Sequence, residues 1–167
     1  MLFIKLIINF FNKKSLFPKK LLLTTLSSAT LFIGLFIYNN YFFAFELIDR
    51  TYMHNGPGPI NSPTDKYTAN AFYEPYGGAA GGVNVWVEIT YNDEKNKVKT
   101  IYYSDAKNNF FMKWIDEDTL YIQNNDPAYP NSDRSITLKV DKEIYHETGR
   151  ACNSILMRDE YATCYKN

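Results

Sequence analysis

The fold class is decided by the stretch Val83-Asn84-Val85-Trp86-Val87-Glu88-Ile89-Thr90-Tyr91. Its apolar residues recur at every second position, which is the period of a strand that buries one face. A polar turn at 92–96 follows, and a second strand-like run occupies 97–103. The two runs together predict a β-hairpin.

More runs with strand composition lie on both sides of this hairpin, at residues 67–73, 110–115, 119–123 and 135–140. The acidic triplet at 116–118 predicts a tight turn between two of them. No long helical period interrupts the strands, so residues 67–167 are predicted to form a mainly β domain, a small antiparallel sheet or sandwich. Residues 155–157 are consistent with either a strand or a short helix.

An uncharged segment precedes the β domain. Residues 21–38 contain no charge, and a helix of this length nearly crosses a hydrocarbon core of roughly 30 Å. Aromatic residues follow it, as expected where a helix leaves a bilayer: Tyr38, Tyr41, Phe42, Phe43 and Phe45. We therefore expect residues 21–45 to form one transmembrane anchor in contact with the lipid bilayer. The Pro- and Gly-rich residues 46–66 are predicted to be a linker.

The charges give this anchor a direction. Residues 1–45 carry five Lys and no acid, whereas residues 46–167 have a net charge of −5. By the positive-inside rule, residues 1–20 are cytoplasmic and the β domain lies outside the cell membrane. The acidic balance also argues against nucleic acid as a partner. A cleaved signal peptide and a buried helix of a soluble protein are the two alternatives to an anchor.

Cys152 and Cys164 are the only two cysteines. In an exported domain, two cysteines in one terminal segment predict a disulfide that restrains the C-terminus. Two unrelated thiols are the alternative. A metal site is disfavoured, because no His lies beside them to complete a tetrahedral set.

Catalytic patterns are weak. His54 lies in the predicted linker and His146 in a polar segment, and no nucleophile motif accompanies them. Acidic residues are present in the β domain, and we considered four of them as members of a carboxylate pair: Glu88, Asp105, Asp126 and Asp133. Exposed acids on a solvated surface are the simpler interpretation. No cofactor is expected.

Two loops are candidates for ligand binding. The run 77–82 contains Gly77, Gly78, Gly81 and Gly82, whose backbone N–H groups a ligand could approach closely. A flexible connection between strands is the alternative. The second loop, 124–133, is rich in oxygen atoms, and Asp126, Asn131 and Asp133 are weak candidates for a Ca²⁺ site. Its composition also fits an ordinary loop.

Several segments resemble a family of small bacterial proteins, mostly from Gram-positive species, that is classed as a domain of unknown function. They are Ser62-Pro63-x-x-Lys66-Tyr67-Thr68, Gly77-Gly78-Ala79, Lys99-Thr100-Ile101-Tyr102-Tyr103 and Lys113-Trp114-Ile115-Asp116-x-x-Thr119-Leu120-x-Ile122. The resemblance implies an N-terminal membrane helix and a β-rich exported part. It implies no activity and no catalytic residues.

Three functional hypotheses follow. The first is a non-enzymatic binding or accessory module at the cell envelope, with an envelope protein or a cell-wall component as partner. Trp86 and Phe111 would be its exposed anchors, unless they form the second side of a sandwich core. The second is an envelope hydrolase that uses Asp or Glu carboxylates. The third is an accessory subunit whose membrane helix is the active part.

Overall fold

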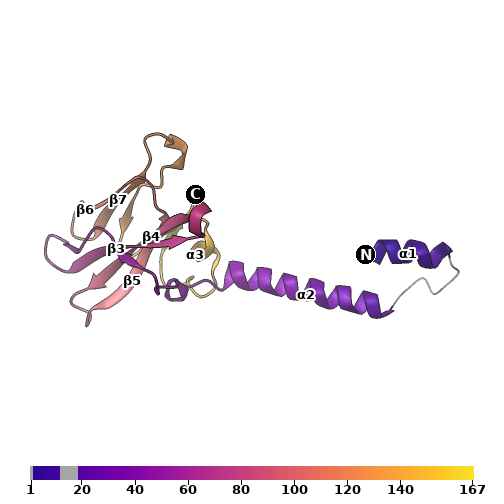
Figure 1. Ribbon diagram of the computed structural model, residues 1–167. Helices are drawn as coiled ribbons and strands as arrows, with labels where there is room; N and C mark the ends of the chain where they lie inside the picture. Colours follow the sequence, from indigo (N-terminus) through magenta and orange to yellow (C-terminus); the bar gives the residue numbers. More distant parts are fainter. Residues whose placement is uncertain (1, 12–18) are drawn as a thin grey trace. The chain divides into compact units, whose positions relative to one another are not determined.

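The structure is a computed structural model and describes residues 2–11 and 19–167. The chain divides into two units, residues 1–42 and residues 43–167, and each is described by itself (Figure 1). Lys13 and Lys14, which belong to the segment predicted to be cytoplasmic, lie outside the described residues.

Two helices make up the described part of the first unit, α1 (Leu2–Phe11) and α2 (Lys19–Tyr41). The segment Lys20–Tyr41 is 22 residues long and apolar enough to cross a membrane. Three threonine hydroxyls within α2 bond to the helix itself: Thr24, Thr25 and Thr30 each donate to the carbonyl four residues earlier, at 2.8–2.9 Å. These polar groups are therefore satisfied without water, as a membrane segment requires.

The second unit contains a seven-stranded sheet and a three-stranded sheet. The larger sheet has the order β1-β3-β4-β5-β9-β10, and β2 also pairs with β3. Its strands are β1 (His54–Asn55), β2 (Ile60–Asn61), β3 (Tyr67–Tyr76), β4 (Gly82–Tyr91), β5 (Lys97–Asp105), β9 (Glu143–His146) and β10 (Thr163–Tyr165). The smaller sheet has the order β6 (Asn109–Trp114), β7 (Thr119–Asn125) and β8 (Ile136–Lys139). The mainly β, antiparallel class is confirmed, and all six predicted runs are strands.

Two pairings in the larger sheet are parallel, a feature that the sequence pattern does not indicate. Strand β9 pairs in parallel with β5, matching Tyr102 with Tyr145 and Tyr103 with His146, and β10 pairs in parallel with β9. The chain leaving β9 therefore runs beside the end of β5. This register places Glu147 next to Ser104 and Asp105.

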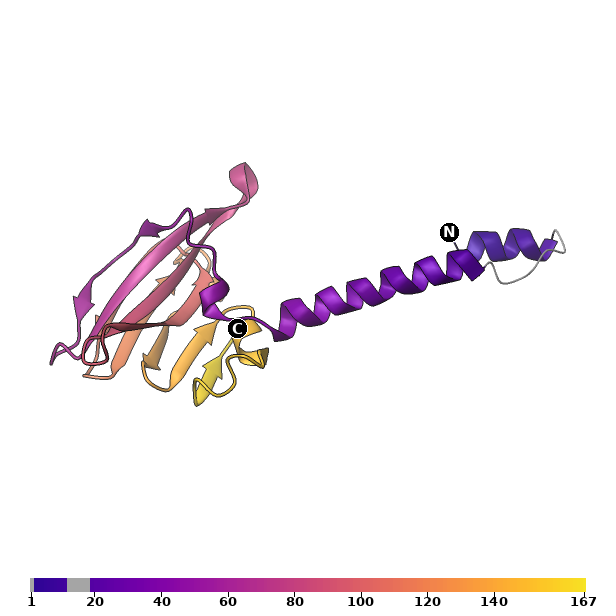
Figure 2. The same ribbon diagram turned by 90° about the horizontal axis from the view of Figure 1, so that it is seen from below.

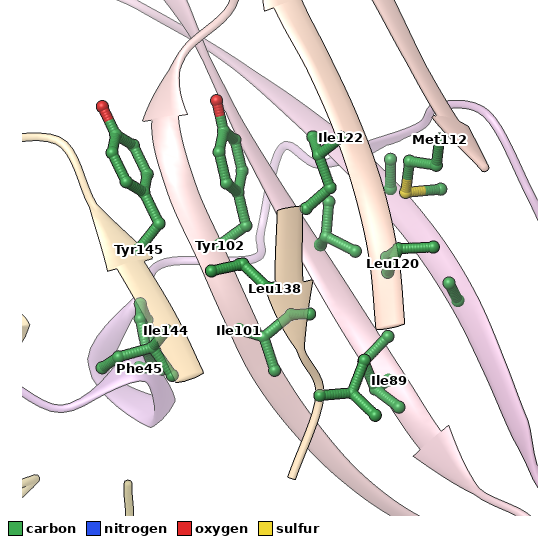
Figure 3. Close-up of a cluster of buried hydrophobic side chains, with 14 of the residues drawn as sticks. Phe45, Ile89, Ile101, Tyr102, Met112, Leu120, Ile122, Leu138, Ile144 and Tyr145 are labelled. Atoms are coloured by element: carbon green, nitrogen blue, oxygen red, sulfur yellow. The ribbon is translucent and has the colours of Figure 1, made fainter. Parts of the chain in front are cut away.

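The core contains apolar side chains of both sheets. Val85, Val87 and Ile89 supply the buried row that the alternation in 83–91 predicts, and each is fully buried. Figure 3 shows Ile89, Ile101 and Tyr102 of the larger sheet beside Leu120, Ile122 and Leu138 of the smaller one, while the rings of Tyr102 and Tyr145 lie side by side at 5.0 Å. Burial of these side chains is the main stabilising contribution to the two-sheet arrangement.

Residues 43–61 belong to this unit, so the prediction that 46–66 is only a linker needs correction. The segment forms a 3₁₀ turn, η1 (Phe45–Leu47), and then pairs with β3 through β1 and β2. Phe45, predicted to be part of an aromatic belt, is buried in the core, and Phe43 packs against that core. The reason is the aromatic surface of His146, whose ring lies 4.7 Å from that of Phe43 and 6.2 Å from that of Phe45.

The C-terminal segment completes the larger sheet at the edge opposite β1 and β2 (Figure 2). It contains a short helix, α3 (Arg150–Asn153), a turn at 155–160, and β10. Residues 155–157 therefore form neither the strand nor the short helix with which their sequence is consistent. Cys152 and Cys164 form a disulfide, with Cα atoms 5.2 Å apart, as predicted.

Candidate functional site

A buried polar cluster links the two sheets. Asn124 of β7 is fully buried, and its side-chain amide donates to the hydroxyl of Tyr102 at 2.7 Å and to the carbonyl of Asp105 at 2.8 Å. Its side-chain oxygen accepts the backbone N–H of Lys107 at 2.7 Å. Buried polar groups are tolerated when they are bonded in this way, and the bonds fix the position of the end of β5.

Glu147 extends this cluster through Ser104 and Asp105 of β5. Its Oε1 accepts from Nε of Arg134 at 2.6 Å, and its Oε2 accepts from the Ser104 hydroxyl at 2.9 Å and the Asp105 backbone N–H at 2.8 Å. Burial alone would raise the pKa of Glu147. The hydrogen bonds and the Arg134 charge outweigh burial, so the pKa lies below its ordinary value.

Beside this cluster, an open concavity of about 290 Å³ forms the Tyr76 site, defined here as Tyr76, Asn84, Asp105, Glu147 and Thr148. Tyr76, at the end of β3, is 44% exposed and donates its hydroxyl to Oδ1 of Asp105 at 2.7 Å. That hydrogen bond raises the pKa of Tyr76, so the phenol remains protonated. The register of β3, β4 and β5 brings these side chains together, since Tyr76 pairs with Gly82 and Asn84 pairs with Asp105.

The predicted glycine loop adjoins this site. All four candidate glycines line a second concavity of about 480 Å³, which shares Tyr76 with the first. The turn η2 (Gly78–Ala80) connects β3 to β4. A Cβ at Gly81 would lie 1.5 Å from the Tyr76 carbonyl oxygen, and Gly78 has a φ of +62°. Backbone geometry therefore requires glycine at position 81 and favours it at position 78, whatever else the loop does.

The Tyr76 site offers one apolar ring face among polar groups that can exchange hydrogen bonds with a ligand. Asp105 can still accept bonds, because its Oδ2 has only a distant contact with Nζ of Lys107, at 3.5 Å. Asn84 and Thr148 add an amide and a hydroxyl to the lining. Such a combination suits a ligand with hydroxyl groups and a flat apolar face.

The three calcium candidates form hydrogen bonds with groups of the protein itself. Asp126 accepts the N–H of Ala128 at 2.8 Å and the amide of Asn108 at 2.7 Å. Asp133 accepts the N–H of Ser135, and the backbone carbonyl of Asn131 faces Arg134. In the part of the chain that the structure describes, no three His, Cys, Asp or Glu side chains are grouped to hold a metal ion.

The remaining candidate residues lie elsewhere. Glu88 accepts from Arg50 at 3.0 Å and from the indole of Trp86 at 3.1 Å. Trp86 is fully buried and stacks on Phe72, so the exposed-anchor interpretation is wrong for it, whereas Phe111 is exposed. His146 is buried, and its Nε2 has no hydrogen-bond partner among residues 2–11 and 19–167.

The sequence model of a family of unknown function, DUF5412, matches residues 14–147. The chain belongs to this family. Comparison with curated proteins and with solved structures gives no match. The DUF5412 match includes α2 and every residue of the Tyr76 site except Thr148. The disulfide lies beyond the DUF5412 match.

Sequence reasoning found one carboxylate of this site, Asp105, and the adjoining glycines. It missed the other members of the site, Tyr76, Asn84, Glu147 and Thr148. No spacing signal points to Glu147, because a parallel pairing between residues 43 positions apart in the sequence brings it to β5. The alternation that identifies β4 could have drawn attention to Asn84 on its polar row.

Proposed function

We propose that this member of DUF5412 is a single-pass protein of a bacterial cell membrane whose β unit lies outside the cytoplasm. There it acts as a non-enzymatic binding module for an envelope component, which it contacts through the Tyr76 site. The N-terminus is cytoplasmic in this proposal.

Two independent features support this location. The five Lys of residues 1–45 all precede the uncharged span, and the first acidic residue of the chain, Glu46, follows it. The Cys152–Cys164 disulfide requires an oxidising compartment to form and persist. Lys asymmetry and cysteine chemistry have different physical origins, yet both favour an exported β unit.

The observation that favours binding over hydrolysis is that both carboxylate oxygens of Glu147 already accept hydrogen bonds from the protein. A glycosidase needs a carboxylic acid with a raised pKa to protonate the leaving group, and a second carboxylate. In the Tyr76 site, three donors hold the Glu147 carboxylate and lower its pKa. Asp105 is left as a single acceptor, which is sufficient to bind a hydroxyl. Glu147 is therefore unsuited to serve as the proton donor that the alternative, an envelope hydrolase, needs here.

The chemistry of the lining favours a glycan of the cell wall as the ligand. A sugar ring has an apolar C–H face that can lie on the exposed ring of Tyr76. Its hydroxyls can donate to Asp105 and exchange hydrogen bonds with Asn84 and Thr148. The half-open shape admits one part of a polymer chain without enclosing it.

Protease added to intact cells stripped of their wall tests the location. We expect digestion of the β unit and protection of the Lys-rich N-terminus, each detected with a terminal epitope tag. Protection of the C-terminal tag on intact cells, with digestion only after lysis, would contradict the exported arrangement.

Sedimentation with purified insoluble cell-wall glycan tests the binding role. The full chain in detergent should co-sediment, and Tyr76→Ala and Asp105→Asn should each weaken binding about tenfold. Tyr129→Ala is the matched control, because Tyr129 is 69% exposed in a loop outside the site. Equal binding by all four proteins would refute the proposed site. Release of soluble sugar fragments by wild type, but not by Asp105→Asn, would instead support the hydrolase.

A further inference from the structure

Two large apolar side chains are exposed next to the start of the β unit. Ile155 and Leu156 are 59% and 53% exposed, although the residues on either side of them, Ser154 and Met157, are each 3% exposed. We call residues 154–158 the Ile155 loop. Exposing two adjacent aliphatic side chains at the tip of a turn has a hydrophobic cost, which a contact with an apolar partner would remove.

The Ile155 loop is held in this conformation at several points. It lies inside the ring closed by the Cys152–Cys164 disulfide. The hydroxyl of Ser154 accepts the N–H of Leu156 at 3.1 Å, and Met157 is part of the hydrophobic core. The loop therefore presents Ile155 and Leu156 as a fixed apolar projection and not as a collapsed or mobile tail.

The covalent chain brings the Ile155 loop near the point where α2 ends. The hydroxyl of Ser154 donates to the carbonyl of Phe43 at 2.5 Å. Phe43 follows the last residue of α2, Tyr41, by only two positions, and two residues span at most about 7 Å. The covalent chain therefore leaves only Phe42 between the end of α2 and Phe43, the residue that Ser154 contacts.

We propose that Ile155 and Leu156 insert into the outer interface of the same bilayer that α2 crosses, and so rest the β unit on the membrane surface. The proposal depends on the membrane-spanning role of α2. The partner that Ile155 and Leu156 contact is lipid, because a helix end at the bilayer surface puts lipid within reach of this loop. Arg158 follows as an exposed cation that can extend to the headgroups. Asp159 and Glu160 come next, so insertion relies on apolar contact and not on net positive charge.

Quenching by lipids with brominated acyl chains tests this contact. The full chain is reconstituted in phosphatidylcholine vesicles, and Leu156→Trp is compared with wild type. The native Trp86 is fully buried in the protein and serves with Trp114 as background. We expect at least a twofold excess of quenching for Leu156→Trp, with emission shifted to shorter wavelength. Ile155→Trp should behave in the same way.

Ile115→Trp is the matched control, since Ile115 is 57% exposed in the turn between β6 and β7 of the other sheet. It should show background quenching. Flotation of each protein with the vesicles reports α2 insertion separately. If the protein floats with the vesicles but Trp at position 155 and Trp at position 156 are both unquenched and exposed to water, the loop contact alone is overturned. A chain that fails to float overturns the anchor and the loop contact together.

Discussion

Nε of Arg134 lies 2.6 Å from Oε1 of Glu147, and both side chains are largely buried, with 12% and 19% exposed. Arg134 precedes the smaller sheet's last strand, and Glu147 follows β9 of the larger sheet. The carbonyl of Arg134 also accepts the hydroxyl of Tyr102 at 3.0 Å. One ion pair thus connects both sheets at the floor of the Tyr76 site.

Replacing Glu147 should destabilise the fold. In Glu147→Gln, the new side-chain N–H₂ group faces hydrogen-bond donors that the carboxylate of Glu147 accepts from in wild type. Arg134 also loses the negative charge of its ion-pair partner. We expect the free energy of unfolding to fall by about 2 kcal/mol, measured by urea denaturation of the full chain in detergent. Glu94→Gln, in the exposed turn after β4, is the control and should be neutral. Equal midpoints for all three proteins would show that the ion pair does not hold the sheets together.

The same pair should produce an acid-dependent loss of stability. Because the pKa of Glu147 is lowered in the folded state, its ionised form stabilises the fold above the unfolded pKa, near 4.5. This contribution is lost as the pH falls through the folded pKa. The difference between wild type and Glu147→Gln should stay constant from pH 7 to 5 and shrink below pH 4.5. A difference that persists unchanged at pH 3 would rule out a contribution from the charge.

His146 should add a second acid-sensitive step. Burial, aided by the charge of Arg150, lowers its pKa from 6.5 to about 4. The unfolded chain binds a proton more readily, so stability should fall by about 2–3 kcal/mol as the pH drops from 6.5 to 4. His146→Phe should flatten this part of the pH profile. Identical profiles for wild type and His146→Phe would contradict a neutral buried imidazole.

The disulfide should stabilise the C-terminal segment by restraining the unfolded chain. Cys152→Ser/Cys164→Ser should lower the free energy of unfolding by about 2–3 kcal/mol. Amide hydrogen exchange should increase in β10 and the Ile155 loop and stay unchanged in β4. Reductant should reproduce this change in wild type and have no effect on the double variant. Free thiols in protein isolated from the membrane would remove the basis for the prediction.

The two glycine positions should respond differently to a side chain. At Gly81 the new Cβ meets the Tyr76 carbonyl oxygen, so Gly81→Val should cost about 3 kcal/mol or more and disturb the turn. At Gly78 nothing lies within 4 Å of the new Cβ, and only the positive φ is strained, so Gly78→Ala should cost about 1 kcal/mol. Thermal unfolding would measure both. A larger loss for Gly78→Ala than for Gly81→Val would mean that the turn has another conformation.

The local patterns of this sequence were sufficient for its main elements. The alternation from Val83 to Tyr91 predicted β4 and its buried row, because side-chain direction in a strand depends only on the parity of position. The absence of charge from Leu21 to Tyr38 predicted α2 for an equally local reason. The pairing of Cys152 with Cys164 was predicted from the number of cysteines, their place in one terminal segment and the expected export of the β domain.

Contacts between distant segments were decided only by the tertiary structure. Strands β1 and β2 are two residues long and show no period, so the segment 46–66 resembled a linker. By the alternation in β4, Trp86 lies on the face opposite the buried Val and Ile side chains, yet it is buried against Phe72. Glu147 reaches the Tyr76 site because β9 pairs in parallel with β5, a choice made by the packing of the whole core. Local periodicity carries no information about which strands become neighbours. The sequence alone therefore determined the main elements, while the fold determined the short strands and the site.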